Sequence, residues 1–379
     1  MMKSIGIYIH LPFCQQKCYY CDYLSYANCK EAEVEAYLWA LVREIKLYRQ
    51  LLGRIKAKSV YLGGGTPTYL TIEQLTKLFN SLEENFDLPK GIEITVEVNP
   101  GFINKEKVSF LFAQGCNRLS IGGQSFRARD LKILGRLHSP KDIEQTFELA
   151  RWAGFTNLSL DLMYGLPGQS LAQWSENLRL ALKLKPEHLA VYQLKIEPDT
   201  PFGRLWARGL WEACTDELAV LMYEKAKHFL VEHGYRHYEI SSYALLGKAA
   251  KHNSLYWLNE PYLGLGAGAA GFLKQRRYLN QAKLKDYYAF LEKGKLPLAE
   301  WEEINEELAR AETMFLGLRL LKGIAKDTFI KKHRVRLEDH YAVEISKLKK
   351  QGLLKETATH LALTEKGIRL ANLVWLEFL

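Results

Sequence analysis

The sequence lacks any run of about 18 apolar residues, the length of a membrane-spanning helix, although 48% of its 379 residues are hydrophobic. It also lacks the marks of a secretory signal, since the first ten residues hold one lysine and neither an apolar core nor a small-residue cleavage site. We therefore expect a cytoplasmic protein without a membrane span. A chain of this length can bury one large core and a second, smaller one.

Cysteine is scarce too, and its six residues include no C-x2-C pair besides Cys18 and Cys21. In a reducing compartment such a set favours metal binding or catalysis over disulfides. Cys14, Cys18 and Cys21 fall within eight residues, directly after an apolar strand pattern. A zinc site usually takes four ligands, and Cys29 is the nearest further thiol, at the start of an expected helix. Three thiolates on one loop instead suit a four-iron cluster with one iron left open, while a partial zinc site or three structural cysteines remain alternatives.

Acidic residues are outnumbered, with 43 Asp and Glu against 52 Lys and Arg, so the net charge is +9. This excess favours an anionic partner: nucleic acid, a membrane surface or a small molecule that carries carboxylates. The basic run "KKHRVR" (331–336) keeps a nucleic-acid-modifying enzyme open as an alternative, although such runs usually form a solvated face.

Strand and helix patterns alternate through the first half of the chain, which predicts a parallel sheet with helices outside it. Strands are expected at Ile5–His10, Ser59–Gly63, Ile92–Val98, Arg118–Gly122, Asn157–Met163 and His188–Leu194. Helices are expected at Glu31–Leu52, Ile72–Phe86, Lys105–Ala113, Pro140–Ala153 and Leu171–Leu184.

The expected strands carry one polar face each. In "IEITVEV" (92–98), Glu93, Thr95 and Glu97 alternate with branched apolar residues, and Asp161 has the same phase in "NLSLDLM" (157–163). A sheet covered by helices on both sides would read as apolar throughout. The alternation therefore favours an incomplete (β/α)6 barrel with a polar interior over a doubly wound sheet.

The remaining chain divides into two parts by composition. Residues 235–297 are rich in glycine and aromatic side chains, and residues 298–379 have the pattern of a small winged-helix-like α+β domain. That last part is expected to open with one long amphipathic helix from Leu298 to Leu321. We thus expect a barrel over residues 1–234, the glycine- and aromatic-rich segment, and the C-terminal domain.

Polar residues gather where the expected strands end, which is where parallel barrels place their sites. Glu97 and Gln124 end the third and fourth strands, and Asp161 has the same phase as Glu97 on the fifth. Arg136 follows Gln124 in the next loop, where its guanidinium could bind a carboxylate. Gly63, Gly64 and Gly65 follow the second strand and let the backbone approach a ligand closely. Buried ion pairing inside a barrel is the alternative interpretation of these charges.

The cysteine loop resembles that of radical S-adenosylmethionine (SAM) proteins, in which SAM chelates the open iron. Five further motifs, in the same order, resemble the oxygen-independent coproporphyrinogen III oxidase group: "YLGGGTPT", "EVNP", "RLSIGGQSF", "LGRLHS" and "DLMYGLPGQ". This resemblance covers most of residues 5–200 and implies a [4Fe–4S] cluster on Cys14, Cys18 and Cys21. It also implies SAM binding by Tyr8, Tyr20, Gly64, Gly65, Thr66, Glu97, Gln124, Arg136 and Asp161.

Within that group, "KHNSLYW" (251–257) is similar to the HNxxYW motif of the HemW branch, proposed as heme chaperones. Members that act as coproporphyrinogen III dehydrogenases carry another cysteine two residues after the third, where this chain has Tyr23. The resemblance implies heme as a further ligand, with His252, Tyr256 and Trp257 as heme-binding residues. Three departures from the branch are Ser242 for Asn, Gly123 for Val and Ala270 for His.

The expected function is therefore a heme chaperone that holds a cluster and SAM and delivers heme to haemoproteins. Coproporphyrinogen III dehydrogenase is the alternative, and an RNA-modifying radical SAM enzyme ranks after it. The expected partners are heme and a heme-accepting protein, with a membrane surface as one meeting place; no nucleic acid is expected. Oligomeric state is left open.

Overall fold

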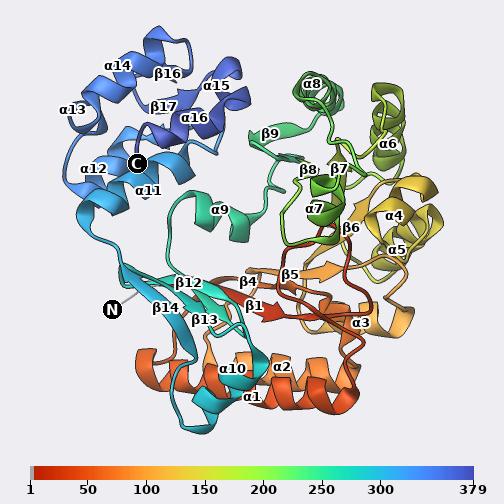
Figure 1. The fold of residues 1–379 in the computed structure, drawn as a ribbon. Coiled ribbons are helices and arrows are strands. Elements are labelled where there is room, and N and C mark those ends of the chain that lie inside the picture. The colour runs from red at the N-terminus through yellow and green to blue at the C-terminus, as the bar shows by residue number, and fades with distance from the viewer. Residues whose placement is uncertain (1–3) are drawn as a thin grey trace.

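The structure, a computed structural model, describes residues 4–379 (Figure 1). Its centre is a curved sheet with parallel strands β1 (Ile5–Leu11), β4 (Ala57–Gly64), β5 (Glu93–Val98), β6 (Arg118–Gln124), β7 (Leu158–Tyr164) and β8 (His188–Gln193). The connecting helices are α1 (Glu31–Leu52), α2 (Ile72–Asn85), α3 (Lys105–Ala113), α4 (Ala128–Leu134), α5 (Pro140–Trp152) and α6 (Leu171–Lys183). All six predicted strands and all five predicted helices are confirmed, and α4 is an addition.

The sheet continues beyond both ends of the parallel set. In the described chain its order is β14-β13-β12-β11-β1-β4-β5-β6-β7-β8-β10-β9, so β14 and β9 are its open edges. The added strands are β9 (Arg236–Glu239), β10 (Ser242–Ala244), β11 (Tyr262–Leu265), β12 (Ala270–Leu273), β13 (Arg276–Asn280) and β14 (Leu298–Glu303). The glycine- and aromatic-rich segment therefore extends the sheet of an open barrel.

The shorter elements surround this sheet. They are β2 (Phe13–Cys14), β3 (Tyr26–Ala27), the 3₁₀ turn η1 (Pro67–Tyr69), α7 (Pro201–Ala207), α8 (Asp216–Glu232), α9 (Lys251–Trp257) and α10 (Leu284–Glu292). In Figure 1, α1 and α2 cover one side of the sheet, and α9 lies between the sheet and the C-terminal helices. No helix of residues 4–379 is both long and apolar enough to cross a membrane.

The two faces of the strands separate as the alternation predicted. Ile5, Ile7 and Ile9 of β1 are fully buried, in one apolar core with the inner residues of α1. Tyr8 and His10 point to the opposite face, where the Tyr8 hydroxyl lies 2.9 Å from His10 Nδ1. This burial accounts for the outer helical layer, while polar side chains remain inside the curve of the sheet.

A buried carboxylate joins α1 to the extension of the sheet. Glu44 is 0% exposed and accepts hydrogen bonds from the Gly266 amide (2.8 Å), the Asn280 side chain (2.7 Å) and the Tyr287 hydroxyl (2.7 Å). Burial raises the pKa of Glu44 to about 7, although the three hydrogen bonds favour the ionised form. The turn before β12 is thereby held against the first helix.

Glu44 should make stability depend on pH. Its pKa is higher in the folded than in the unfolded chain, so its contribution is most favourable below about pH 4.5 and declines as pH rises to about 7. In E44Q that decline should disappear. The difference in unfolding free energy between the variant and wild type should therefore change by roughly 3 kcal/mol between about pH 4.5 and about pH 7. Denaturant unfolding of cluster-free protein between pH 5 and 8 measures it. E303Q, at an exposed position, is the control, and parallel curves for wild type and E44Q would contradict the prediction.

The helix expected from Leu298 begins instead at Glu306, so that part of the prediction is wrong. Leu298–Glu303 forms strand β14, in which Trp301 pairs with Tyr278 of β13. The Arg276 guanidinium covers the Trp301 ring at 4.8 Å. Asn305 then accepts a hydrogen bond from the Leu308 amide (2.8 Å) and caps the helix, which the amphipathic pattern did not reveal.

The C-terminal domain has its own core, with Met314, Phe329 and Leu361 among its fully buried residues. Its elements are α11 (Glu306–Gly317), β15 (Ile324–Ala325), α12 (Lys326–His333), α13 (Leu337–His340), α14 (Ala342–Lys350), β16 (Leu354–Glu356), β17 (His360–Leu363), α15 (Glu365–Arg369) and α16 (Ala371–Leu376). The strands pair in the order β15-β17-β16, as a winged-helix-like domain requires. We propose 304 in place of 298 as its first residue.

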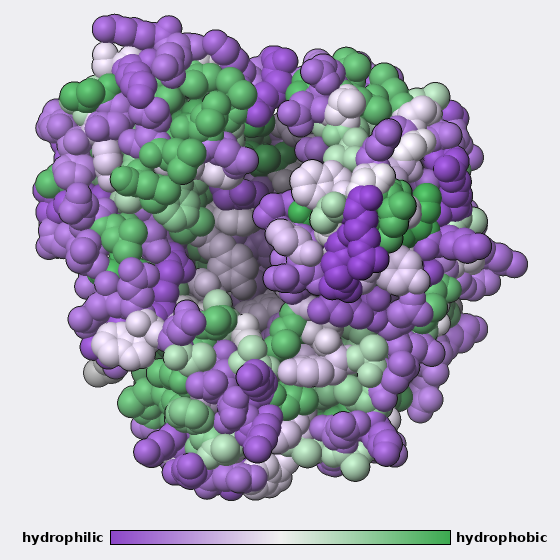
Figure 2. Space-filling view, viewed as in Figure 1, coloured by the Kyte–Doolittle hydropathy of each residue, from purple (hydrophilic) through white to green (hydrophobic). Residues whose placement is uncertain are grey.

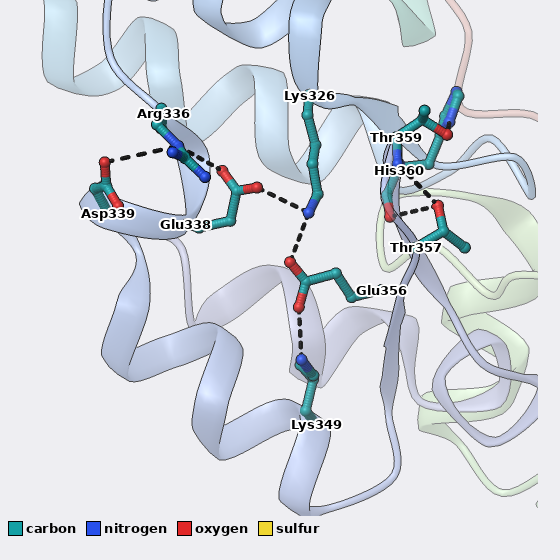
Figure 3. Close-up of polar contacts among 9 residues, drawn as sticks. All are labelled: Lys326, Arg336, Glu338, Asp339, Lys349, Glu356, Thr357, Thr359 and His360. Atoms are coloured by element: carbon teal, nitrogen blue, oxygen red, sulfur yellow. Dashed lines mark hydrogen bonds and ion pairs between the residues drawn. The ribbon is translucent and has the colours of Figure 1, made fainter.

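Charged side chains fix the wing of this domain (Figure 3). Lys326 lies 2.8 Å from Glu338 and 2.7 Å from Glu356, and Glu356 also contacts Lys349. Burial alone would lower the pKa of Lys326, but its two carboxylate partners raise it. The network joins α12, α13, α14 and β16.

Three residues of the basic run 331–336 have polar partners within the domain or on α9's C-terminal loop. Lys332 donates to the Asn259 carbonyl (2.7 Å), and His333 lies 2.9 Å from the Thr313 hydroxyl. Arg336 lies near two carboxylates, those of Glu338 and Asp339. These contacts give part of the run a structural role.

Candidate cluster and cofactor site

The cysteine loop follows β1 at the carboxyl end of the parallel strands. Cys14 lies in β2, and all three thiols are partly exposed and unbridged. Two neighbouring loops direct donors at the sulfurs: the Thr66 hydroxyl lies 3.6 Å from Cys14 Sγ, and an Arg136 guanidinium nitrogen lies 3.5 Å from Cys18 Sγ. Cluster sulfur atoms accept such hydrogen bonds, so these residues fit a cysteine-held iron–sulfur centre.

Burial raises the pKa of the Cys14 thiol, and it raises that of Cys21 to about 11. Both thiols are therefore protonated until iron displaces the proton. Within residues 4–379, no three His, Cys, Asp or Glu side chains converge closely enough to hold a single metal ion.

The glycine turn after β4 seats this loop. The Gly65 amide donates to the Leu11 carbonyl (3.0 Å), and the Thr66 amide donates to the Phe13 carbonyl (2.8 Å). A Cβ atom on Gly65 would lie 2.6 Å from that Leu11 oxygen, and Gly64 has a φ of +100°. The glycines thus allow β4 to dock against the start of the cysteine loop, in addition to leaving the backbone open to a ligand.

Glu97 is held in place by two donors. The Tyr61 hydroxyl donates to one carboxylate oxygen (2.7 Å), and the Gly64 amide donates to the other (3.0 Å). Burial raises the pKa of Glu97 to about 7, and the Asp161 charge adds to the rise. An oriented carboxylate beside the glycine turn suits a cationic amino group or a ribose of SAM.

Asp161 lies farther round the barrel on β7. The hydroxyls of Ser120 and Ser159 lie 3.3 and 3.5 Å from one of its oxygens. Burial raises its pKa to about 6, although Arg118 opposes that rise. Glu97 and Asp161 face the same interior, as their shared phase predicted.

Arg136 and Gln124 complete the rim with partners that the sequence did not single out. Arg136 donates to the Gly122 carbonyl (2.6 Å) and to the side-chain oxygen of Asn99 (2.8 Å), and Gln124 accepts from the Tyr192 hydroxyl (2.8 Å). Asn99 directly follows a strand, which was an available signal. Tyr61 and Tyr192 resembled ordinary strand residues.

A cavity of about 430 Å³ opens beside the cysteine loop. Its walls include Cys18, Thr66, Asn99 and Arg136, together with Lys107 of α3. Tyr20, proposed for SAM, packs nearby against the cluster of Leu134, Met163, Leu166, Leu194 and Phe202. Burial raises the pKa of Tyr20, so its hydroxyl stays neutral.

The motif KHNSLYW forms α9, whose second residue, His252, is buried. The Lys251 and His252 amides donate to the two carboxylate oxygens of Glu93 (3.0 and 2.8 Å), which anchors the helix to β5. His252 is 1% exposed, with Nδ1 2.8 Å from the Ser59 hydroxyl and Nε2 2.8 Å from the Tyr256 hydroxyl. Both ring nitrogens are thus engaged, and neither is open to heme iron in this conformation.

His252 is also connected to the proposed SAM residues. Its ring lies 5.2 Å from that of Tyr61, whose hydroxyl holds Glu97. Burial lowers the pKa of His252 to about 3, which keeps the imidazole neutral. Sequence separation hid this contact, because α9 returns to the barrel about 190 residues after β4.

Trp257 faces the C-terminal domain. The Arg319 guanidinium lies 4.2 Å from the centre of its ring, and the next polar residue, Asn259, binds Arg277 (3.0 Å) and Glu312 (3.3 Å). One face of the Trp257 ring is therefore covered, and a part in packing heme requires the other face or a domain movement.

The three departures from the HemW pattern have local settings. A Cβ on Gly123 would lie 2.7 Å from a Leu160 methyl, so Leu160 occupies the space of a larger residue. Ser242 is buried in β10. Burial raises the pKa of Glu239, and a hydrogen bond with Ser242 offsets part of that rise. Ala270 is exposed in β12.

Comparison with known proteins agrees with this geometry. Residues 8–181 match the radical SAM superfamily, and residues 304–370 match the HemN C-terminal domain. The heme chaperone HemW of Bacillus subtilis (strain 168) is 38% identical over 379 residues, covering 100% of this chain and 99% of the relative. The heme chaperone HemW of Escherichia coli (strain K12) is 33% identical and covers 97% of this chain and 96% of the relative. The chain belongs to the HemW family of radical SAM proteins.

Membership in the radical SAM superfamily implies a [4Fe–4S] cluster and SAM. This chain also shares its fold with the solved structure of coproporphyrinogen III oxidase (HemN) from Escherichia coli. That structure has a TM-score of 0.88 at 24% identity and covers 99% of this chain and 90% of its own. The similarity confirms the open α/β radical SAM architecture with its C-terminal domain.

We expect E97A and D161A to keep the cluster and to weaken SAM binding. Each removes a charged acceptor from the interior, and such a loss typically lowers affinity by roughly ten- to a hundredfold. Anaerobic calorimetry with reconstituted protein measures the change. Y61F is the milder control, because Glu97 keeps its Gly64 donor. Unchanged affinity in both alanine variants would remove Glu97 and Asp161 from the SAM site.

Proposed function

We propose that this protein is a heme chaperone: it holds a [4Fe–4S] cluster and SAM in the barrel, binds heme, and passes heme to an acceptor protein in the cytoplasm or at a membrane surface. The observation that carries the proposal is end-to-end similarity to proteins named as heme chaperones, at 38% and 33% identity. The similarity spans the barrel, α9 and the C-terminal domain, so it includes every element described above.

The cluster residues would be Cys14, Cys18 and Cys21. The SAM residues would be the nine named from the family resemblance: Tyr8, Tyr20, Gly64, Gly65, Thr66, Glu97, Gln124, Arg136 and Asp161. The open iron would bind SAM, and the cluster would supply one electron if SAM is cleaved. The chain's own residues provide the rest: Arg136 and Thr66 donate hydrogen bonds to the sulfurs, and Glu97 is fixed by Tyr61 and Gly64.

For heme, His252, Tyr256 and Trp257 remain proposed residues, with one condition that the structure adds. His252 can bind iron through Nε2 only after its hydrogen bond to Tyr256 breaks. A switch of this kind suits a carrier, because an internal competitor weakens retention of the cargo.

The test is a heme titration of anaerobically reconstituted protein. A stoichiometric Soret band at micromolar heme supports the chaperone, and transfer to an apo-haemoprotein supports delivery. Turnover of a tetracarboxylate porphyrinogen, with no heme bound, would favour the dehydrogenase instead. That alternative now rests on the shared fold with HemN, and Tyr23 stands where its members have a further cysteine.

A further inference from the structure

Arg118 carries a buried positive charge at the floor of the barrel. It is the first residue of β6, is 2% exposed and shares the inward phase of Ser120. Its Nε is fully enclosed without a hydrogen-bond partner, and its charge lies close enough to Asp161 and Glu97 to lower the pKa of both carboxyls. A buried guanidinium with an unsatisfied N–H is costly, because that N–H has lost its hydrogen bond to water.

Two histidines flank Arg118 in matching settings, each between a strand serine and a tyrosine hydroxyl. The two sets are Ser59–His252–Tyr256 (2.8 and 2.8 Å) and Ser159–His188–Tyr238 (2.8 and 2.9 Å). Burial lowers the pKa of both imidazoles, and the Arg118 charge lowers it further. Both rings are neutral, so they offer Arg118 no counter-charge and add no second cation.

The carboxylates of the interior accept hydrogen bonds from groups other than Arg118, although its charge lowers the pKa of Asp161. Glu97 is held by Tyr61 and Gly64, and Asp161 accepts from serine hydroxyls. Glu93 accepts the two first amides of α9. Beside Arg118, its register partner on β5, Thr95, is 0% exposed and has a hydroxyl without a partner. The floor therefore holds a guanidinium N–H and a hydroxyl that are both buried and without a hydrogen-bond partner.

The surface of the molecule is hollowed beside α9 (Figure 2). Figure 2 shows a hollow on this face, where edge strand β9 and α9 lie opposite each other in Figure 1. Residues of intermediate hydropathy line its depth. A flat, largely apolar ligand with charged groups at one edge matches such an entrance, with its charged edge directed inward.

We propose that Arg118 is a ligand-binding residue that takes a carboxylate of the molecule held in the barrel, and that this carboxylate is a propionate of the porphyrin. The inference rests on the proposed heme function. A guanidinium presents two parallel N–H groups that match the two oxygens of a carboxylate, which an ammonium group does not. Heme carries its two carboxylates at one edge of the ring, so one can reach the floor.

The experiment compares iron protoporphyrin IX with its dimethyl ester, whose propionates are uncharged, in wild type, R118Q and R118K. Wild type should bind the free acid at least about tenfold more tightly than the ester. R118Q should lose that preference by weakening only the acid, and R118K should fall between. R276Q, at an exposed arginine paired with Glu303 (2.8 Å), is the matched control and should behave as wild type. Iron–sulfur content should stay unchanged in all variants.

An R118Q variant that keeps the full preference for the acid overturns the inference while leaving the heme function intact. If wild type binds neither porphyrin, the proposed function fails, and the inference falls with it. If R118Q does not fold, wild type and R118K decide: equal affinity of wild type for acid and ester, or an R118K preference equal to that of wild type, also overturns it.

Discussion

Replacing Cys14, Cys18 or Cys21 with alanine should abolish assembly of the four-iron cluster. The three thiols lie on one loop at the carboxyl ends of the strands, and no other cysteine of the described chain lies on that loop between β1 and β3. Each variant loses one of three protein ligands, and two thiolates do not hold a cubane against solvent and chelators. Iron and sulfide analysis after anaerobic reconstitution should give less than about a tenth of the wild-type content, and SAM binding should disappear with the cluster.

The matched controls are the other three cysteines. Cys116 is 1% exposed in the main core, Cys214 follows α7, and Cys29 precedes α1, where its carbonyl accepts a hydrogen bond from the Tyr69 hydroxyl. Their alanine variants should retain full iron and sulfide. A full cluster in C14A, or stoichiometric zinc in the purified wild type, would refute the assignment.

The fold of the first two hundred residues could be predicted because local pattern and global structure agree there. Each parallel strand alternates an outer apolar face with an inner polar one, and each helix has an apolar stripe that matches it. The extension of the sheet was not predictable in the same way. Its strands are short, and β11 pairs with β1 across more than 250 residues of sequence, which no local period reports.

The candidate site also contains residues that the sequence could reveal and residues that it could not. Glu97, Asp161 and the glycine turn could be found because their residue types are unusual at the end of a buried strand. In the sequence, Arg118 is marked only as the first residue of an expected strand. Its significance depends on its buried Nε, which has no hydrogen-bond partner in the described structure. That feature follows from packing, and no sequence pattern indicates it.

The motif in α9 changes most between sequence and structure. As a sequence it is a set of His, Tyr and Trp in a segment rich in glycine and aromatic residues. In the fold, its first turn is anchored to Glu93 inside the barrel, while Trp257 packs under Arg319 of the C-terminal domain. α9 therefore joins the SAM side of the barrel to that domain, and any heme site built on it is coupled to both.

This coupling gives opposite expectations for two neighbouring residues. Y256F should tighten heme binding by roughly five- to tenfold, because it frees His252 Nε2 from a hydrogen bond with a net value of about 1 kcal/mol. H252A should abolish the Soret band of bound heme, since the iron loses its proposed ligand. H252A should also lower SAM affinity a few-fold, because Tyr61 then loses the ring against which it packs. Heme titration and anaerobic SAM calorimetry on the same preparations measure both effects.

Comparing Y256F with H252A distinguishes a His252 that binds heme iron from a His252 with a purely structural role. If His252 only supports the floor of the barrel, Y256F and H252A both remove a buried hydrogen bond, and both should weaken heme and the fold together. A gain in Y256F beside a complete loss in H252A is expected only if imidazole and iron compete for the same nitrogen. S59A is the control for the other side of the ring, since it removes the partner of Nδ1 and leaves Nε2 bound to Tyr256. If S59A tightens heme as much as Y256F does, or if H252A with heme has the wild-type spectrum, the iron is bound elsewhere.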